Sequence, residues 1–571
     1  MNKALKIVNF FQKNKIFVLF LFIILTSITE LLLFTLLQPL LLYLSDTSST
    51  INFPYLESLI GKNIDLKTFL LIFFLIFTLR ASMAIMVSYK KHSLIEELHN
   101  LISSKIFSKY LSKDFQFYIA NNSSSLTANI IFEVNKFCYY VIDCMIAIVA
   151  EGFLIIAIFI YLVTVYFEAS IMLIVSISLF FLIFNRYYKM NSTKMGQLKT
   201  IHDNKRLEDL QRSFYIIQNI KLDKLENFFS KRFKLNTEIS SRSFFRLQFM
   251  GEIAKPIIEF ASLIIISIVI FFFYIYFEAS KEQIFLMMSL FFISLFRILP
   301  SCNKVFHNYN ALKFHQASIG IIHSEIFNNK STNRNYDFNK NNKKEVINFN
   351  KSISLKDVNF SYDDSQKHIL SDVNITIEKD KTIGIYGASG SGKTTLLNLI
   401  CHLLKPSSGQ LLIDENSVES NPESYQEKIG YVSQRVYLMD DSIINNVILG
   451  QELDKFNYAL FDDVMKKADL DTMIKNFPDG KDTLIGERGI KLSGGQQQKL
   501  GIARALYKKP KILILDEATN ALDNYSELEV FKTLTALKNK ITIIIVSHKK
   551  SLIEFCDIKF KVEKGKVIKD I

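Results

Sequence analysis

Long apolar runs alternate with polar, lysine-rich stretches along the first 300 residues of this 571-residue chain. A helix needs roughly 20 mostly apolar residues to cross the hydrocarbon core of a bilayer. Runs near that length occur at about residues 16–44, 66–88, 140–165, 169–188, 257–277 and 284–300. This pattern predicts an all-α membrane domain with six transmembrane helices.

The charges between the apolar runs predict how the helices are oriented. Lysines precede the first run, and the segments 89–136 and 186–255 are rich in Lys and Arg. Because basic residues favour the cytoplasmic side, we expect the N-terminus and both segments there. Both segments are too long for tight turns, so the helices should continue into the cytoplasm and reverse near 112–124 and 221–230. On the outer side, 46–65 is expected to form a small amphipathic surface helix.

After about residue 350 the pattern changes to short apolar strands and amphipathic helices, which is typical of a soluble α/β domain. The segment before it is rich in Asn and Lys and has few apolar residues, so it cannot bury enough surface to fold alone. We therefore predict a transmembrane domain at 1–328, a linker at 329–350 and an α/β domain at 351–571.

A candidate phosphate-binding loop lies early in the α/β domain. The segment KTIGIYGASGSGKTTLLNLI (381–400) has the pattern of a strand, a glycine-rich turn and a helix, and its GASGSGKT fits GxxxxGK[ST]. Glycines let backbone N–H groups surround a phosphate chain, and the helix N-terminus adds a positive dipole. Lys393 is expected to reach the β- and γ-phosphates, and Thr394 to bind magnesium.

Two carboxylates follow a later apolar strand in KILILDEATN (511–520). Asp516 is expected to help hold magnesium, and Glu517 to polarise the attacking water, as phosphoryl transfer requires. Two acids after a strand are weak evidence alone. Following a phosphate-binding loop in this order, they predict an ATP-hydrolysing site that uses ATP and Mg²⁺.

Composition adds two constraints. The chain is 49% hydrophobic yet carries a formal net charge of +13, and the two properties come from different halves. Its five cysteines form no CxxC pair and no Cys/His cluster with zinc spacing. We therefore expect free thiols, not a disulfide framework or a zinc site.

The segment KLSGGQQQKL (491–500) resembles the signature motif of ABC ATPases. Other stretches are similar to the remaining motifs of that family: FSYDD, YVSQ, TLIGERG, NALD and IVSHKK. The resemblance covers about 355–571. It implies that Tyr362 stacks on adenine, that Gln434 is the Q-loop glutamine and that His548 is the switch histidine.

The same resemblance implies how the site residues divide. The catalytic set is Glu517, His548 and Gln434, and the magnesium ligands are Thr394, Gln434 and Asp516. The nucleotide-binding set is Tyr362, Gly387, Ser389, Gly390, Ser391, Gly392, Lys393, Thr394, Thr395, Ser493, Gly494, Gly495, Gln496 and Asp523. In ABC proteins the signature loop of one subunit completes the ATP site of the other. One copy of each motif therefore implies a half-transporter that must dimerise. Because Glu517, His548 and LSGGQ all match the active pattern, a homodimer is favoured over a heterodimer with one degenerate site.

Six spans ahead of the ATPase domain, with long helical extensions, resemble the exporter-type (type IV) ABC fold. This organisation excludes a soluble ABC ATPase of translation or repair, so nucleic acid is not an expected partner. An importer is also disfavoured, because importers usually keep ATPase and membrane parts on separate chains.

Ionisable residues inside the predicted spans are costly in a bilayer and therefore point to function. Glu30, Arg80 and Glu151 lie within spans, and Arg297 ends the sixth, just before Pro300. Internal bridges, Glu30–Arg80 or Glu151–Arg80, are the alternative explanation for the glutamates. For Arg297 we expect a role facing a cavity, which suits an anionic head group better than an apolar drug.

The membrane half also resembles the PglK-type lipid-linked oligosaccharide flippases, in SITELLLFTLLQPLLLYLSD, TLRASMA and FRILPSCNKVFHNYNALKFHQASIGII. Such flippases turn an undecaprenyl-pyrophosphate-linked glycan from the cytoplasmic to the periplasmic side of the bacterial inner membrane. The resemblance implies that Arg80 and Arg297 attract the pyrophosphate. It also implies a multi-pass inner-membrane protein, with a cytoplasmic ATPase domain and with membrane lipids and a lipid-linked glycan as partners. Export of a peptide or bacteriocin, or of another lipid or drug, stays open as an alternative.

Overall fold

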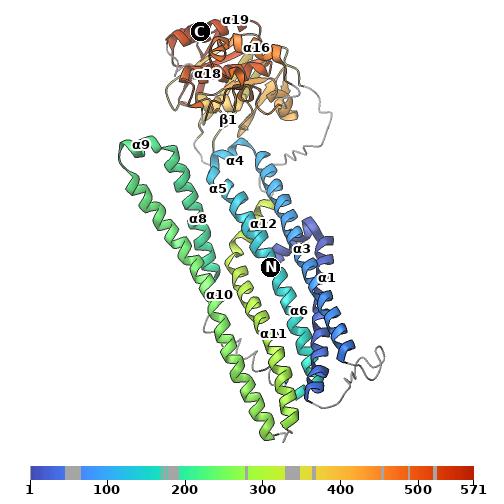
Figure 1. Cartoon of the computed structure of the whole chain (residues 1–571). Coiled ribbons are helices and arrows are strands. Elements are labelled where there is room, and N and C mark those ends of the chain that lie inside the picture. Colours follow the sequence, from blue (N-terminus) through green and yellow to red (C-terminus); the bar gives the residue numbers. More distant parts are fainter. Residues whose placement is uncertain are drawn as a thin grey trace. The chain divides into compact units, whose positions relative to one another are not determined.

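The computed structural model of the chain contains two compact units (Figure 1). One comprises Met1–Lys113 and Asn121–Arg334, and the other comprises Asp114–Ala120 and Asn335–Ile571. The structure describes residues 2–45, 66–168, 170–171, 175, 192–276, 281–327, 347–362, 368–451, 456–486, 489–518 and 524–570.

Some sequence predictions fall outside the described residues. The expected external helix at 46–65 does so entirely, as does the candidate nucleotide-binding residue Asp523. Most of the predicted fourth span at 169–188 and most of the predicted linker at 329–350 do so as well. These predictions stay predictions.

The first half of the chain is built from long helices, as the apolar runs predict (Figure 1). The helices are α1 (Asn2–Ser45), α3 (Leu66–Leu111), α4 (Phe115–Ala120), α5 (Ser123–Ala128), α6 (Asp143–Val165), α8 (Ser192–Tyr215), α9 (Ile217–Leu222), α10 (Glu226–Tyr276), α11 (Lys281–Phe314) and α12 (Gln316–Phe327), with π-helical turns η1 (Asn129–Glu133) and η2 (Lys136–Ile142). Within the described part, four stretches are long and apolar enough to cross a membrane: Asn2–Leu36, Leu66–Leu111, Ser123–Val165 and Met288–Phe314.

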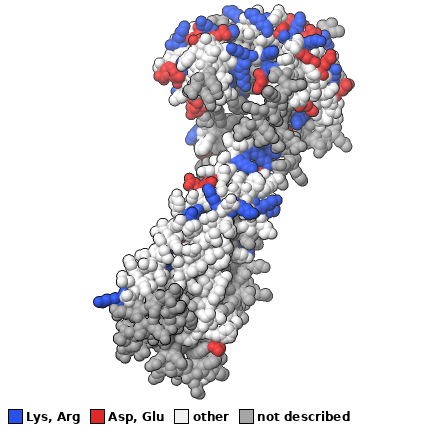
Figure 2. Space-filling model, turned by 90° about the vertical axis from the view of Figure 1, so that its right-hand side faces the viewer, with Lys and Arg blue, Asp and Glu red and all other residues white. Residues whose placement is uncertain are grey.

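The surface of these helices has the character of a lipid-facing surface. On the face drawn in Figure 2, the helices present mainly uncharged side chains, whereas the second unit presents both acidic and basic ones. Large apolar side chains such as Phe74, Ile85 and Phe260 are more than half exposed. A soluble protein rarely exposes such a continuous apolar surface, so a bilayer is the environment that these helices fit.

Several helices extend well beyond the length that a bilayer requires. α3 has 46 residues and α10 has 51, against the roughly 20 of one span. The short helices α4 and α9 lie at the two predicted reversals. The extensions are therefore helical hairpins, as the basic segments predict.

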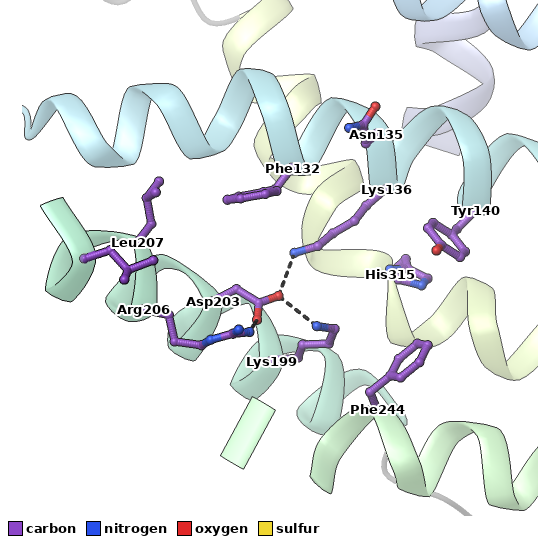
Figure 3. A pocket seen from close by; sticks show the side chains of 11 residues that line it. Phe132, Asn135, Lys136, Tyr140, Lys199, Asp203, Arg206, Leu207, Phe244 and His315 are labelled. Carbon is purple, nitrogen blue, oxygen red and sulfur yellow. Dashed lines mark hydrogen bonds and ion pairs between the residues drawn. The ribbon is translucent and has the colours of Figure 1, made fainter. Parts of the chain in front are cut away.

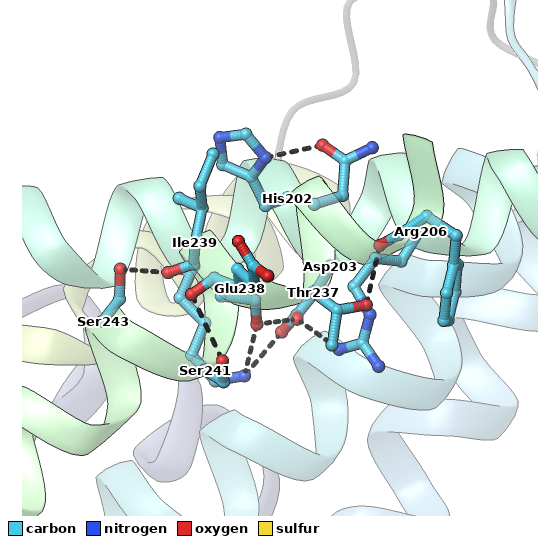
Figure 4. Close-up of polar contacts among 12 residues, drawn as sticks. His202, Asp203, Arg206, Thr237, Glu238, Ile239, Ser241 and Ser243 are labelled. Atoms are coloured by element: carbon cyan, nitrogen blue, oxygen red, sulfur yellow. Dashed lines mark hydrogen bonds and ion pairs between the residues drawn. The ribbon is translucent and has the colours of Figure 1, made fainter. Parts of the chain in front are cut away.

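Polar contacts hold α8 against α10 along one of these hairpins (Figure 4). Asp209 is buried, and its carboxylate accepts a hydrogen bond from Asn236 at 2.8 Å and pairs with Arg232 at 2.8 Å. The side-chain oxygen of the same Asn236 lies 2.8 Å from Nδ1 of His202, which precedes Asp209 by about two turns of α8. These pairs satisfy buried polar groups across the two helices and so help to hold α8 against α10.

A glycine allows α8 to approach α11 closely. A Cβ atom placed on Gly196 would lie 1.6 Å from the backbone oxygen of Phe314. That atom belongs to the backbone of the neighbouring helix, so it cannot turn aside as a flexible side chain would. Only glycine fits at this crossing.

We expect Gly196→Ala to destabilise the membrane domain by about 1–3 kcal/mol, the usual cost of overpacking. The detergent-solubilised protein should melt several degrees below wild type in a thermal scan. The matched control is Gly320→Ala in α12, because a Cβ there meets nothing within 4 Å. Alanine is also the better helix former, so this control should melt at or above wild type. Equal melting temperatures for Gly196→Ala and wild type would contradict the close crossing.

The second unit is an α/β fold with two sheets (Figure 1). In its described residues, one sheet has the order β2-β1-β4-β5 and the other β10-β9-β3-β8-β7-β6. The strands are β1 (Ser352–Phe360), β2 (Leu370–Glu378), β3 (Thr382–Tyr386), β4 (Ser408–Ile413), β5 (Asn416–Ser417), β6 (Ile429–Val432), β7 (Ile512–Asp516), β8 (Thr542–Val546), β9 (Ile558–Glu563) and β10 (Lys566–Asp570). The helices are α13 (Lys393–Ile400), α14 (Pro422–Gln426), α15 (Ile443–Ile448), α16 (Tyr458–Lys467), α17 (Asp471–Lys475), α18 (Gly494–Tyr507), α19 (Asn524–Leu537) and α20 (Lys550–Glu554), with 3₁₀ turns η3 (Val418–Ser420) and η5 (Gly480–Asp482).

The order of the second sheet determines where the site lies. β3 pairs with β8 and β8 with β7, all in parallel, and the residues of β7 and β8 are all buried. Parallel strands end at the same edge of a sheet, and ligands of open α/β sheets bind beyond their carboxyl ends. The glycine-rich loop after β3, the carboxylates after β7 and the residues after β8 therefore meet at that edge.

Candidate nucleotide site and intramembrane charge cluster

The glycine-rich loop after β3 has the backbone that a phosphate cradle needs. Gly387 has φ +155°, and a Cβ on it would lie 2.2 Å from the carbonyl oxygen of Val562. Gly392 has φ +106° and is the N-cap residue of α13. Side chains at these two positions would strain the loop, so the glycines are required by its shape.

Two polar side chains of the loop fit a phosphate. The Lys393 ammonium donates to the carbonyl oxygens of Gly387 and Ala388 at 3.1 and 2.9 Å, so it lies inside the loop. The Ser391 hydroxyl is buried and has no hydrogen-bond partner among the described residues. A buried hydroxyl without a partner costs free energy, and an incoming phosphate oxygen would satisfy it.

Asp516 ends β7 and is buried there. Its Oδ2 accepts a hydrogen bond from the Tyr431 hydroxyl at 3.1 Å. Burial raises the pKa of the Asp516 carboxyl above its ordinary value, although this hydrogen bond acts in the opposite direction. A nearby cation favours the charged form of a buried carboxyl, so the site is suited to Mg²⁺.

Glu517 brings the three predicted catalytic residues together. Its Oε2 accepts a hydrogen bond from Gln434 Nε2 at 2.8 Å, and its Oε1 lies 3.1 Å from His548 Nε2. Its backbone has φ +50°, and its N–H donates to Val546 O at 3.0 Å. A non-glycine residue in this region is uncommon and clusters at functional sites, which fits a carboxylate aimed by its backbone.

The signature segment forms the start of α18. Ser493 is the N-cap, and its hydroxyl and the Gln496 side chain accept hydrogen bonds from each other's backbone N–H groups. Such a capping box stabilises a helix start. Two residues later, Gln498 Nε2 donates to Gln434 O at 2.9 Å, which connects this helix to the Q-loop glutamine.

Tyr362, predicted to stack on adenine, lies beside the phosphate-loop helix. Its hydroxyl is 3.2 Å from Thr395 Oγ1, and its ring meets Phe360 edge to face at 5.0 Å. The nucleotide-binding residues of the loop and Tyr362 are therefore neighbours. Its role toward the base remains a prediction.

The intramembrane arginines share one carboxylate. Arg80 Nη2 lies 3.0 Å from Glu30 Oε1, and Arg297 Nε pairs with the same oxygen. The Glu30–Arg80 bridge anticipated from the sequence is therefore present. The other anticipated bridge, between Glu151 and Arg80, is wrong. Glu151 pairs with Lys304 instead, at 2.7 Å.

Sequence reasoning missed Tyr431 and Gln498 as members of the site. Both reach it through the fold, Tyr431 by pairing of β6 with β7 and Gln498 from within α18. Nothing in the local pattern distinguishes either residue from others of its kind. Among the described residues, no group of three or more His, Cys, Asp or Glu could hold a metal ion.

Two family models match the chain in succession. Residues 16–299 match the ABC transporter transmembrane region, and residues 370–520 match the ABC transporter ATPase model. The predicted fold class, a helical membrane domain followed by an α/β P-loop ATPase domain, is confirmed.

Curated relatives and a solved structure agree with these matches. An ATP-dependent lipid A-core flippase of Ralstonia nicotianae is 27% identical over 478 residues, 81% of this chain and 77% of the relative. A protein of the same name from Haemophilus ducreyi is 38% identical over 229 residues, 40% of this chain and only 39% of that relative. The structure of a bacterial Atm1-family ABC exporter with ATP bound has the same fold, with a TM-score of 0.76 at 20% identity, over 98% of this chain and 95% of the other.

Proposed function

Because this chain belongs to the ABC transporters, with an exporter-type membrane domain ahead of an ATPase that drives transport, we propose that it flips a lipid-linked oligosaccharide. The lipid would be a polyprenyl pyrophosphate such as undecaprenyl pyrophosphate. The direction would be from the cytoplasmic to the periplasmic side of a bacterial inner membrane, with the N-terminus and the ATPase domain in the cytoplasm.

The observation that carries this proposal is the charge cluster of Glu30, Arg80 and Arg297. Two guanidinium groups against one carboxylate leave one positive charge in excess within predicted membrane helices. All three side chains are less than a third exposed, so the charge is poorly solvated. Arginine binds phosphate groups through paired N–H donors, and a pyrophosphate would neutralise the excess.

The relatives support a lipid cargo in general. The proteins from Ralstonia nicotianae and Haemophilus ducreyi are both named as flippases of lipid A-core. A flippase of another lipid is therefore the second candidate, and export of a peptide or a drug is the third.

We propose a homodimer in which each ATP lies between the phosphate loop of one subunit and the signature segment of the other. Glu517 would orient and deprotonate the attacking water, with Gln434 and His548 positioning its carboxylate. Thr394, Gln434 and Asp516 would hold Mg²⁺, whose charge would offset that of the phosphates.

Flipping in proteoliposomes tests the proposal. Purified protein would be reconstituted with a polyprenyl-pyrophosphate-linked oligosaccharide, and the exposure of the glycan to an added glycosidase would be followed with and without ATP. We expect ATP-dependent movement that is absent from Glu517→Gln vesicles. If wild-type protein hydrolyses ATP but the exposure of the glycan does not change, the proposed cargo is wrong. A flippase of another lipid then becomes the leading candidate.

A further inference from the structure

A second cationic site lies in the first unit, and its lining residues include none of the Glu30 cluster (Figure 3). It is a cavity of about 430 Å³ between η1–η2, α8 and α10, with His315 at one end. Tyr140 on its wall begins the predicted third span, and His315 directly follows the apolar stretch Met288–Phe314. Under the predicted topology, the cavity is on the cytoplasmic side of the membrane, because Lys199, Asp203 and Phe244 all lie in the segment 186–255.

Three cations converge on one carboxylate in this cavity. Asp203 lies 2.9 Å from Lys199, 3.3 Å from Arg206 and 3.6 Å from Lys136 (Figure 3). Burial opposes ionisation of Asp203, but hydrogen bonds from Ser240 and Lys199 hold its pKa below the ordinary value. The carboxyl group is therefore charged at neutral pH.

Positive charge remains in excess when the surroundings are included. Lys136 also pairs with the fully buried Glu133 at 2.7 Å, so three cations face two carboxylates. The Arg206 Nε atom is buried and has no hydrogen-bond partner among the described residues. An anion entering the cavity would meet a net positive charge and an unused guanidinium donor.

Apart from Asn135, the rest of the wall is apolar and aromatic. Phe132, Tyr140 and Phe244 line the cavity, and His315 stacks on Tyr140 at 4.8 Å between ring centres. Burial and the nearby Lys136 and Lys199 lower the pKa of His315 to about 4. The imidazole is therefore neutral at physiological pH and continues the aromatic surface without adding charge.

The backbone around the cavity is irregular where the helices should be regular. Phe132 lies in the π-helical turn η1, and Lys136 and Tyr140 lie in η2. On the opposite side, His315 lies between the end of α11 and the start of α12. Widened helical turns are rare and occur mainly at functional sites, and here they frame the cavity.

We propose that this cavity binds the phosphate-bearing head group of a prenyl lipid on the cytoplasmic side of the membrane. The cations would take the phosphate, and the aromatic wall would take the first carbons of the chain. Basic pockets between membrane helices on the cytoplasmic side commonly bind lipid head groups. The site would load the cargo before it reaches Arg80 and Arg297, and this part of the inference rests on the proposed function.

Photolabelling of the full-length protein in neutral detergent tests the site. The probe is a photoreactive farnesyl pyrophosphate, and mass spectrometry identifies the labelled peptide. We expect label within residues 132–140 or on Phe244, displaced by farnesyl pyrophosphate at least tenfold more efficiently than by inorganic pyrophosphate or farnesol. Efficient displacement by inorganic pyrophosphate alone would mean a site for free phosphates, and label confined to other residues would overturn the inference.

Variants separate this site from the Glu30 cluster. Arg206→Gln should weaken labelling about tenfold, and Phe132→Ala should do so without disturbing the ion pairs. The control is Arg212→Gln on the same helix, whose side chain is 57% exposed and pairs with Glu208. It should label like wild type, and so should Arg297→Ala. Unchanged labelling of both Arg206→Gln and Phe132→Ala would contradict the site.

Flipping assays keep the two proposals distinguishable. If the labelling result fails while wild-type protein flips the glycan, only the loading site is wrong. If labelling succeeds while wild-type protein does not flip the glycan, the cavity binds a prenyl phosphate but the proposed cargo is wrong.

Discussion

The Glu517→Gln protein should bind ATP with near wild-type affinity and lose ATP turnover by about 10²- to 10⁴-fold, the usual contribution of a general base. The substitution removes a negative charge and keeps the size of the side chain. The phosphate loop, which is proposed to make the main nucleotide contacts, is not changed by it. Steady-state phosphate release and equilibrium binding of a fluorescent ATP analogue measure the two properties separately.

Glu554→Gln provides the control for this experiment. Glu554 is 62% exposed and lies 3.8 Å from Lys550, in the same ATPase domain. The Glu554→Gln protein should hydrolyse ATP at the wild-type rate. If Glu517→Gln also hydrolyses ATP at a rate near wild type, Glu517 does not have the catalytic role and another group must activate the water.

Arg297→Ala should reduce flipping at least tenfold while basal ATP hydrolysis falls less than twofold. The guanidinium lies in the first unit and pairs with Glu30, whereas the residues proposed for hydrolysis lie in the second unit. Removing it leaves Arg80 and Glu30 as a neutral pair, so the excess positive charge for a pyrophosphate disappears. Flipping and phosphate release are measured on the same proteoliposomes.

Glu30→Gln separates binding of cargo from packing of the helices. If the cluster has a structural role, Glu30→Gln should lose as much flipping as Arg297→Ala, because both arginines lose their shared partner. A cargo role predicts that the two arginines remain available and that flipping is better preserved than in Arg297→Ala. Equal loss of flipping and hydrolysis in Arg297→Ala would identify it as a packing residue.

Much of the candidate ATP site could be predicted because its chemistry depends on contiguous residues. A phosphate loop needs glycines, a lysine and a hydroxyl at fixed spacing, and these residues stand together from Gly387 to Thr394. The carboxylates at Asp516 and Glu517 follow an apolar strand in the same way. Membrane spans are equally local, because the bilayer sets their length and composition.

Partner choice could not be predicted, because it depends on which helices pack together. Glu30 and Arg297 are separated by 267 positions, and two bridges were equally reasonable from the sequence. In the packed structure, Glu30 pairs with both arginines and Glu151 pairs with Lys304. The cavity around Asp203 was not anticipated at all, since Lys136 reaches it from η2, far from α8 in the sequence, and each of its cations resembles an ordinary surface lysine or arginine.

The sequence by itself therefore determined the fold class and the order of the two domains, and it indicated the candidate phosphate-binding residues. These features follow from apolar periodicity and fixed motif spacing, which act over a few residues. Only the tertiary structure decided how Gln434 and His548 meet Glu517, and where positive charge is left in excess among the helices. The physical reason is that ion pairs and hydrogen bonds act over a few ångströms in space, between residues far apart in the chain.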